Sequence, residues 1–317
     1  MKQSYRPRDL ILLTGTPLST PADIYGYSRF LNPNWLTKGI FEAHHVAEYD
    51  HFGKPVKWKN QDELQKVFME FACRVQQEDV LTDLPEIYYE PFVYALNPEH
   101  QKIYDKVVKE KLLELKGQKD VSFNNASAAA AALQQVVIGV EKYAKSEAEA
   151  QKLRKKIAGL EVIDLTMGKI GDEKMIIFAY YQKSIEVMVD HCKERGWNPA
   201  EISGRISNNQ KSIEKFKEDP TCKVIIIQVI SGGSGLEFQD VCRNVLFMEF
   251  PKLAKDFRQA VARVYRKGQK LLTRVWIATA LKTVQVRQQK RVLERDEEVN
   301  QVQITYKDLQ DYLYGDE

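Results

Sequence analysis

The sequence has few cysteines, no long apolar run and no strong excess of one charge. Its four cysteines, Cys73, Cys192, Cys222 and Cys242, lie far apart, and no two have the two-residue spacing of a zinc knuckle. We expect reduced core thiols rather than a disulfide framework. The longest apolar runs, such as Met175–Tyr181, span about seven residues, whereas a membrane helix needs roughly 20. This pattern excludes a transmembrane protein.

Two kinds of short signal are also missing. The amino terminus, MKQSYRPRDL, has basic residues but no apolar core before a cleavage site, so we expect an intracellular protein.

The chain has no Gly-Lys-Thr, Gly-Lys-Ser or Asp-Glu-x-His motif. Lys54 and Lys169 each follow a glycine, but Pro55 and Ile170 come next. Neither lysine can therefore belong to a phosphate-binding P-loop, which needs a hydroxyl at that position.

Length and charge distribution indicate what is present. With 317 residues we expect two lobes, each with its own core. The net charge of +3 hides an uneven chain: residues 251–295 hold 13 basic and 2 acidic side chains, while the last 22 residues hold 1 basic and 7 acidic. A basic segment of this density favours a phosphate-rich partner such as nucleic acid over a merely solvated face.

The apolar pattern predicts an α/β fold. Short runs rich in Val, Ile and Leu alternate with amphipathic helical segments, as in a doubly wound parallel sheet. The expected strands are Leu10–Leu13, Met175–Tyr181, Val224–Ile230, Val245–Phe250 and Val275–Ala278. The expected helices between them are Ser184–Arg195 and Asn208–Glu218. We place this lobe at residues 170–283, with ligands at the carboxyl ends of its strands.

The flanking regions differ from the sheet lobe. Residues 97–169 read as a helical protrusion, with helices over Pro98–Lys116, Asn124–Val140 and Glu141–Leu160. Residues 284–302 form a final charged helix, and 284–317 as a whole read as a brace helix and acidic tail. Residues 1–96 precede the protrusion.

Three segments have the composition of a functional site. Leu12–Pro17 is a strand that runs into a Thr-Gly-Thr-Pro turn, and Ser231–Glu237 is a glycine-rich loop after a strand. In the third, Asp256–Gln269, a continuous helix would place Gln259, Arg263 and Arg266 on one face. Two guanidinium groups at one spot suit a phosphoryl group. Tight turns and salt bridges are the alternative explanations.

In their order and spacing these segments resemble the Swi/Snf-type ATPases, a branch of the superfamily-two helicases. The resemblance spans about residues 10–302. Its most specific part is Gln259–Gln269 (QAVARVYRKGQ), similar to the family's QAxxRxxRxGQ motif six. The other matching segments are Leu13–Pro17 (motif three), Cys73–Pro85, Met175–Lys183 (motif four), Ile202–Lys217, Ser231–Glu237 (motif five) and Thr283–Val302. The implied fold is a RecA-like lobe preceded by the helical region and, in 1–96, the end of a first RecA-like lobe.

The resemblance also implies roles for individual residues. Arg263 and Arg266 would be arginine fingers that reach the γ-phosphate of ATP, and Gln259 would orient them. The residues implied at the nucleotide cleft or in its coupling to DNA are Thr14, Gly15, Thr16, Gly233, Gly235 and Glu237. The residues implied to contact the DNA backbone are Ser203, Gly204, Gln228 and Lys183.

The sequence departs from the family pattern at several positions. Leu18 follows Thr-Gly-Thr-Pro where the family has asparagine, Gln228 replaces a Ser or Thr, and Lys211 replaces a common arginine. Glu237 occupies a position that is often Asn or Asp, from which it could accept from a ribose hydroxyl or pair with an arginine. These changes affect single DNA contacts more than the fold.

The missing P-loop shapes the functional hypothesis. ATP and Mg²⁺ would be held mainly by a P-loop lobe outside this chain, which resembles a family member cut upstream of motif three. We expect the carboxyl-terminal portion of a DNA-dependent ATPase that translocates on duplex DNA. A non-catalytic DNA-binding or scaffold module is the alternative, and an RNA-directed helicase is disfavoured by the form of motif six. No metal site is expected within the chain.

Overall fold

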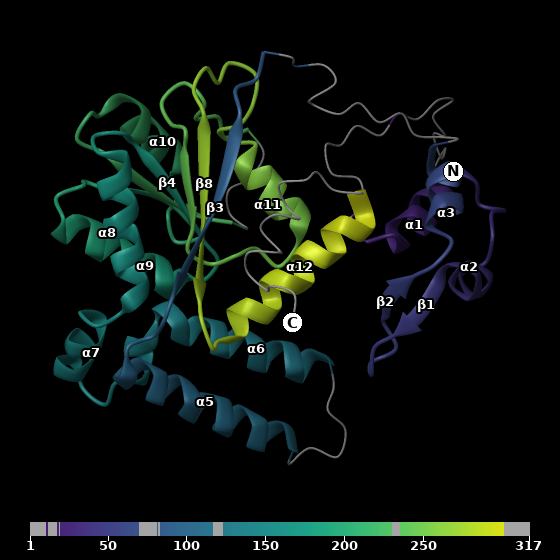
Figure 1. The fold of residues 1–317 in the computed structure, drawn as a ribbon, viewed down its shortest axis with the longest axis horizontal. Helices are drawn as coiled ribbons and strands as arrows, with labels where there is room; N and C mark the ends of the chain where they lie inside the picture. The colour runs from purple at the N-terminus through teal and green to yellow at the C-terminus, as the bar shows by residue number, and fades with distance from the viewer. Residues whose placement is uncertain are drawn as a thin grey trace, which may run out of the picture.

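The computed structural model describes residues 11, 18, 20–69, 81, 83–116, 123–229 and 235–300. Figure 1 shows the arrangement of the elements. The helices are α1 (Ala22–Leu31), α2 (Lys38–His45), α3 (Gln61–Met69), α5 (Pro98–Lys116), α6 (Phe123–Ile138), the short 3₁₀ helix η1 (Val140–Tyr143), α7 (Glu147–Arg154), α8 (Ala158–Ile170), α9 (Gln182–Glu194), α10 (Asn209–Glu218), α11 (Ala254–Val261) and α12 (Val284–Asn300). The strands are β1 (Val46–Tyr49), β2 (Pro55–Trp58), β3 (Ile87–Tyr94), β4 (Met175–Ala179), β5 (Ala200–Ile202), β6 (Val224–Gln228), β7 (Asn244–Phe247) and β8 (Thr273–Ala280).

The larger sheet has six strands in the order β3-β8-β7-β4-β6-β5. Every neighbouring pair is parallel. In the central register, Ile177 of β4 lies between Ile226 of β6 and Leu246 of β7. The strand order reverses direction around β4, as it does in doubly wound α/β folds. The predicted α/β class is confirmed.

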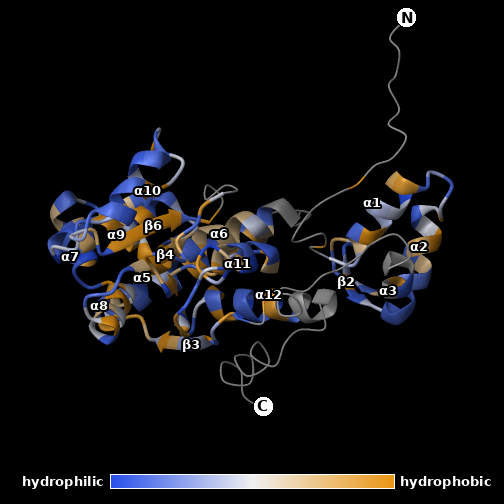
Figure 2. Cartoon of the chain, turned by 90° about the horizontal axis from the view of Figure 1, so that it is seen from above, coloured by the Kyte–Doolittle hydropathy of each residue, from blue (hydrophilic) through white to orange (hydrophobic). Residues whose placement is uncertain are grey.

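Both faces of this sheet are buried, and successive side chains point to opposite faces. Ile177 and Ile226 belong to the core under α5, α6, α8 and α9, whereas their neighbours Ile176 and Ile225 belong to the core under α10, α11 and α12. All four side chains are fully buried. Figure 2 shows β4 and β6 as a hydrophobic centre among helices with hydrophilic outer surfaces. The continuous apolar runs in the sequence reflect this two-sided burial.

The helical elements before the sheet lobe follow the prediction with one correction. The predicted helix over Glu141–Leu160 is wrong, because this stretch contains η1, α7 and the start of α8. The chain leaves helical geometry at Ser146, whose hydroxyl accepts from the Glu149 N–H and caps α7. The chain leaves helical geometry a second time at Ile157, whose extended backbone precedes α8.

The boundary drawn at residue 96 also needs correction. Ile87–Tyr94 lies in the stretch that we assigned to a first lobe and linker, but it forms β3 and pairs along its whole length with β8. The side chain of Glu90 in β3 accepts a 2.7 Å hydrogen bond from the Trp276 indole. The sheet thus recruits a strand from far upstream, which a contiguous domain at 170–283 does not include.

Residues 20–69 contain a separate small core. Phe41 and Trp58 are buried there, and β1 pairs with β2 in an antiparallel sheet. The expected strand Leu10–Leu13 and the Thr-Gly-Thr-Pro turn fall outside the described residues, apart from Ile11.

Candidate functional site

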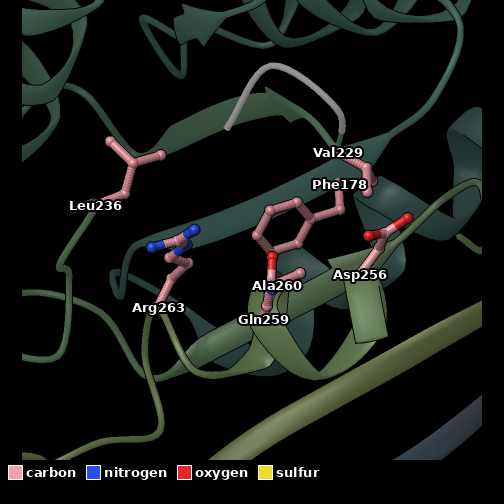
Figure 3. A pocket seen from close by; sticks show the side chains of 7 residues that line it. All are labelled: Phe178, Val229, Leu236, Asp256, Gln259, Ala260 and Arg263. Carbon is pink, nitrogen blue, oxygen red and sulfur yellow. The ribbon is translucent and has the colours of Figure 1, made fainter. Parts of the chain in front are cut away.

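A pocket lies at the carboxyl ends of β4 and β6, against α11. Its walls come from β4, from the segment after β6, from α11 and from the segment after α11. The lining residues are Phe178, Val229, Leu236, Asp256, Gln259, Ala260 and Arg263. Figure 3 shows the Arg263 guanidinium and the Asp256 carboxylate on either side of the Phe178 ring. This is the edge at which open parallel sheets bind ligands. Two of the three predicted motif-six residues, Gln259 and Arg263, therefore share one pocket.

The backbone around Arg263 differs from the prediction. The continuous helix through motif six is wrong, because α11 ends at Val261. Beyond the helix end, the Arg263 carbonyl accepts a 2.9 Å hydrogen bond from the Phe238 N–H, which lies in a separate segment. Tight turns follow, in which the Val264 N–H bonds to the Val261 carbonyl. Arg263 still faces the pocket, but Arg266 is not among the lining residues.

The charges in this pocket are perturbed by burial. Burial, and next the nearby Arg266 charge, lower the pKa of Arg263. Burial also raises the pKa of Asp256. A half-buried cation beside a second cation gains stability from an anionic partner. The pocket therefore suits a negatively charged ligand group next to Arg263.

Arg266 instead forms an ion pair with the segment after the glycine-rich loop. Its guanidinium nitrogen lies 2.8 Å from a carboxylate oxygen of Glu237, and the two side chains are 38% and 47% exposed. A pair this exposed is worth about 0–1 kcal/mol, so an incoming anion can compete for the arginine. Of the two roles weighed for Glu237 from sequence, acceptance from a ribose hydroxyl and pairing with an arginine, the structure contains the arginine pair.

The glycine-rich segment is described only in part. Gly235 has a φ of +100°, a backbone conformation that side chains rarely adopt and that accounts for glycine at this position. Gly233 falls outside the described residues, as do Thr14, Gly15 and Thr16. Their predicted roles stay predictions.

The predicted DNA-facing residues gather at the neighbouring strand ends. Ser203 follows β5 in a turn closed by a 3.1 Å hydrogen bond from the Ile206 N–H to the Ser203 carbonyl. The Ser203 side chain is 1% exposed and donates to the Glu201 carboxylate at 2.5 Å. Gly204, the next residue in the turn, is exposed. A DNA contact through the Ser203 hydroxyl stays a prediction and would need this hydroxyl to leave Glu201.

Lys183, at the start of α9, is part of an ion-pair network. Its ammonium lies 2.9 Å from Glu141 and 3.1 Å from Glu186, and the hydrogen bond to Glu141 raises its pKa. Burial favours the neutral form of Glu141, but hydrogen bonds from Arg154 and Lys183 outweigh this and lower its pKa. Arg205 extends the network to Glu186 and Glu201. Lys183 therefore fixes η1 to α9 in this structure, and its DNA contact stays a prediction.

The described residues contain no cluster of His, Cys, Asp or Glu side chains able to hold a metal ion. The polar groups of the pocket include guanidinium and amide donors, which fit phosphate oxygens. Asp256 is the one carboxylate among the lining residues of this pocket, and a single carboxylate is a poor site for Mg²⁺.

Comparison with known proteins agrees with this geometry. Residues 140–268 match the family described as helicase conserved C-terminal domain. Over 282 residues the chain is 24% identical to the CHD3-type chromatin-remodeling factor PICKLE of Arabidopsis thaliana, covering 84% of this chain and 20% of the relative. It is 27% identical to an uncharacterized ATP-dependent helicase of Mycoplasma pneumoniae, covering 87% of this chain and 26% of that relative. The match to the helicase conserved C-terminal domain covers the whole stretch from Phe178 to Arg263 that lines the pocket.

Solved structures of Swi/Snf-type proteins share the fold. The Sulfolobus solfataricus SWI2/SNF2 ATPase core domain superposes with a TM-score of 0.53 at 20% identity, covering 90% of this chain and 59% of that one. The C-terminal part of the Fun30 ATPase domain gives a TM-score of 0.51 at 16% identity, covering 73% of this chain and 97% of that one. The chain spans only 20% and 26% of the lengths of the two curated relatives named above.

The sheet lobe contains one strand-end residue that sequence reasoning missed. Glu249 is 3% exposed and lies just beyond β7. Its carboxylate accepts from the Tyr180 and Tyr181 N–H groups at 2.7 and 2.8 Å and from the Ser184 hydroxyl at 2.6 Å. It thereby joins the end of β7 to the end of β4 and the start of α9. The sequence signal that could have found Glu249 is an acidic side chain near the end of the apolar run Val245–Phe250.

Among the described residues, no helix is both long and apolar enough to cross a membrane.

Proposed function

We propose that this chain is the carboxyl-terminal portion of a DNA-dependent ATPase and translocase, which acts with a P-loop lobe that the chain does not supply. One observation supports this most directly: the Arg263 guanidinium, with its pKa lowered by burial and by Arg266, lines a pocket at the strand ends together with Gln259. A cation in this setting is suited to an anion presented from across an interlobe cleft.

The arginines would act by stabilising charge. As a phosphoryl group transfers, negative charge grows on its oxygens, and Arg263 is positioned to bind it with parallel hydrogen bonds. Arg266 would join it by exchanging Glu237 for the phosphate. Gln259, on the last turn of α11, would orient the Arg263 side chain from the same pocket wall.

ATP and Mg²⁺ are the proposed cofactors. ATP supplies the phosphoryl group and Mg²⁺ neutralises its oxygens when both are bound. This chain would contribute Arg263 and Arg266 to the phosphate, and the P-loop lobe would contribute the metal ligands. The ATP-dependent helicase among the relatives supports the use of ATP.

Duplex DNA is the proposed partner. The structure of the Sulfolobus solfataricus SWI2/SNF2 ATPase core in complex with dsDNA superposes with a TM-score of 0.50 at 20% identity, over 93% of this chain and 61% of that one. The turn at Ser203 and Gly204 and the Lys183 side chain would meet the DNA backbone. Backbone contacts of this kind position the protein without reading sequence.

Reconstitution tests the proposal. The chain alone should not hydrolyse ATP, and addition of a P-loop lobe encoded by the adjacent upstream reading frame should give DNA-stimulated hydrolysis. Arg263→Ala and Arg266→Ala should each lower kcat by about 10³- to 10⁵-fold, because each removes a cation from the transferring phosphoryl group. Arg291→Ala, at an exposed position on α12, is the matched control and should leave the rate unchanged.

Two results would contradict the enzyme proposal: a reconstituted pair that stays inactive with duplex DNA, or an Arg266→Ala variant with the wild-type rate.

A non-catalytic DNA-binding module is the second candidate. It is favoured by the Arg266–Glu237 pair, which occupies one predicted finger without nucleotide. Absence of an upstream frame with Gly-Lys-Thr and Asp-Glu-x-His motifs would support it.

A further inference from the structure

Gln228 is placed to connect three strand ends. It is the last residue of β6, which lies between β4 and β5 in the sheet. Its side-chain oxygen accepts a 3.0 Å hydrogen bond from the Gly204 N–H, in the turn after β5. Its side-chain nitrogen donates a 3.1 Å hydrogen bond to the Tyr180 carbonyl, just after β4. One amide therefore holds a backbone group of each neighbouring loop.

The Gly204 turn contains a backbone N–H donor that is already occupied by a side chain. The Ser203 carbonyl accepts from the Ile206 N–H, and the Ser203 hydroxyl oxygen accepts from the Arg205 N–H at 3.4 Å. Gly204 itself is exposed. Without a side chain at this position, a large ligand such as a phosphate can approach the backbone closely. The Gly204 N–H nevertheless points to Gln228.

We propose that Gln228 competes with DNA phosphate for the Gly204 N–H, so that its side-chain oxygen limits DNA affinity at this turn. This inference rests on the proposed function, because it takes duplex DNA as the ligand. A backbone N–H is a single donor, and a phosphate oxygen can bind it well only after the Gln228 oxygen has left. DNA binding therefore includes the loss of one existing hydrogen bond.

The cations near the Gly204 turn are also occupied by partners. Arg205 is held by Glu201 at 2.6 Å and by Glu186 at 3.2 Å. Lys183 is held by Glu141 and Glu186. Arg205 and Lys183 are thus already paired with acids. Release of the Gly204 N–H from Gln228, by contrast, breaks a single neutral hydrogen bond.

Two substitutions at Gln228 separate competition from simple support of the loop. Gln228→Ser shortens the side chain and Gln228→Met keeps its length, and both free the Gly204 N–H. We expect each to tighten binding of a labelled random-sequence 20-base-pair duplex by about 2- to 10-fold, the equivalent of one neutral hydrogen bond. Gln228→Glu keeps an acceptor for Gly204 and adds negative charge, so it should weaken binding. Fluorescence anisotropy with the full chain at fixed salt measures these affinities.

Gln288→Met is the matched control. Gln288 also uses its amide to hold a backbone group, the Phe250 carbonyl at 3.0 Å, but it lies on α12. It should leave DNA affinity unchanged, and circular dichroism melts should show that all four variants fold.

The outcomes are distinct. If the wild-type chain binds duplex DNA and neither Gln228→Ser nor Gln228→Met binds more tightly, competition is wrong, while the proposed DNA partner stands. If neither wild type nor these variants bind, the proposed partner and the competition both fail. Binding by the two variants alone supports both proposals.

Discussion

At the residue scale, the site edge is organised by polar side chains that bond backbone groups of neighbouring loops. Gln228 does this for the ends of β4 and β5, and Glu249 for the end of β4 and the start of α9. Gln269 does it for two segments: its amide nitrogen donates to the Cys242 carbonyl before β7, and its oxygen accepts from the Leu271 N–H after motif six. Each side chain satisfies buried or half-buried groups that would otherwise be costly to leave unpaired.

Glu249 gives a pH prediction. Its pKa is raised, because burial of the carboxylate outweighs the hydrogen bonds from Ser184, Tyr181 and Tyr180. A raised folded-state pKa means that the native state holds the proton more tightly, so this group contributes stability below its unfolded pKa, near 4.5, that is lost as pH rises above it.

The comparison with Glu249→Gln isolates this contribution, because the variant side chain does not titrate. The free energy of unfolding of the wild type, relative to that of the variant, should increase as pH falls from 8 toward 4.5. Urea denaturation at several pH values measures the difference. A relative stability that is flat, or that decreases on acidification, would contradict it.

Residue roles were only partly predictable. The motif-six pattern predicted that Gln259 and Arg263 share a site, because their spacing nearly matches a helical turn even though the helix ends at Val261. It could not predict that Phe238 binds the Arg263 carbonyl, since this contact joins separate loops. The internal partners of Ser203 and Lys183 likewise depend on tertiary placement of Glu201 and Glu141.

At the element scale, local pattern sufficed where a strand is buried on both faces. The runs around β4, β6, β7 and β8 are continuous and apolar, and they were predicted. Strand β3 was missed because Ile87–Tyr94 contains Glu90 and Pro91 and lies at the sheet edge, where a proline is tolerated. Its partner β8 is remote in sequence, so no local signal marks the pairing.

Packing of α8 gives a prediction with an internal control. A Cβ at Gly159 would lie 2.6 Å from the Ile138 Cδ1 atom and 2.9 Å from the Tyr94 hydroxyl oxygen. Gly159→Ala should therefore lower the free energy of unfolding by about 1–3 kcal/mol through overpacking between α8, α6 and β3.

Gly168 lies on the same helix, and a Cβ there meets nothing within 4 Å. Gly168→Ala should raise stability by about 0.5–1 kcal/mol, because alanine favours the helix. Chemical denaturation of both variants checks the pair, and equal effects of the same sign would disprove the close approach of α8.

At the scale of the whole molecule, the chain contains cores of very different size. The two cores of the six-stranded sheet share the buried strands β4, β6, β7 and β8. Among the described side chains, the buried apolar ones in the core of residues 20–69 are Ile24, Phe41, Val46, Trp58 and Leu64. Because buried apolar area provides most of the folding free energy, the smaller unit should be much less stable.

Hydrogen exchange under increasing urea tests this difference. Backbone amides of α2, β1 and β2 should lose protection at lower urea than those of β4 and β6, because the small core opens without the sheet. Mass spectrometry of peptides from the intact chain gives the two profiles. A single shared urea dependence would show instead that the chain unfolds as one cooperative unit.

The hydrogen bond from the Phe238 N–H to the Arg263 carbonyl has a mechanical consequence. It ties the peptide unit that carries one guanidinium to the chain immediately after the glycine-rich loop, while Glu237, one residue earlier, holds the other guanidinium. A displacement of this short stretch is thus transmitted to both arginines at once, through one covalently continuous dipeptide. We therefore expect a ligand that displaces Glu237 and Phe238 to shift both cations together.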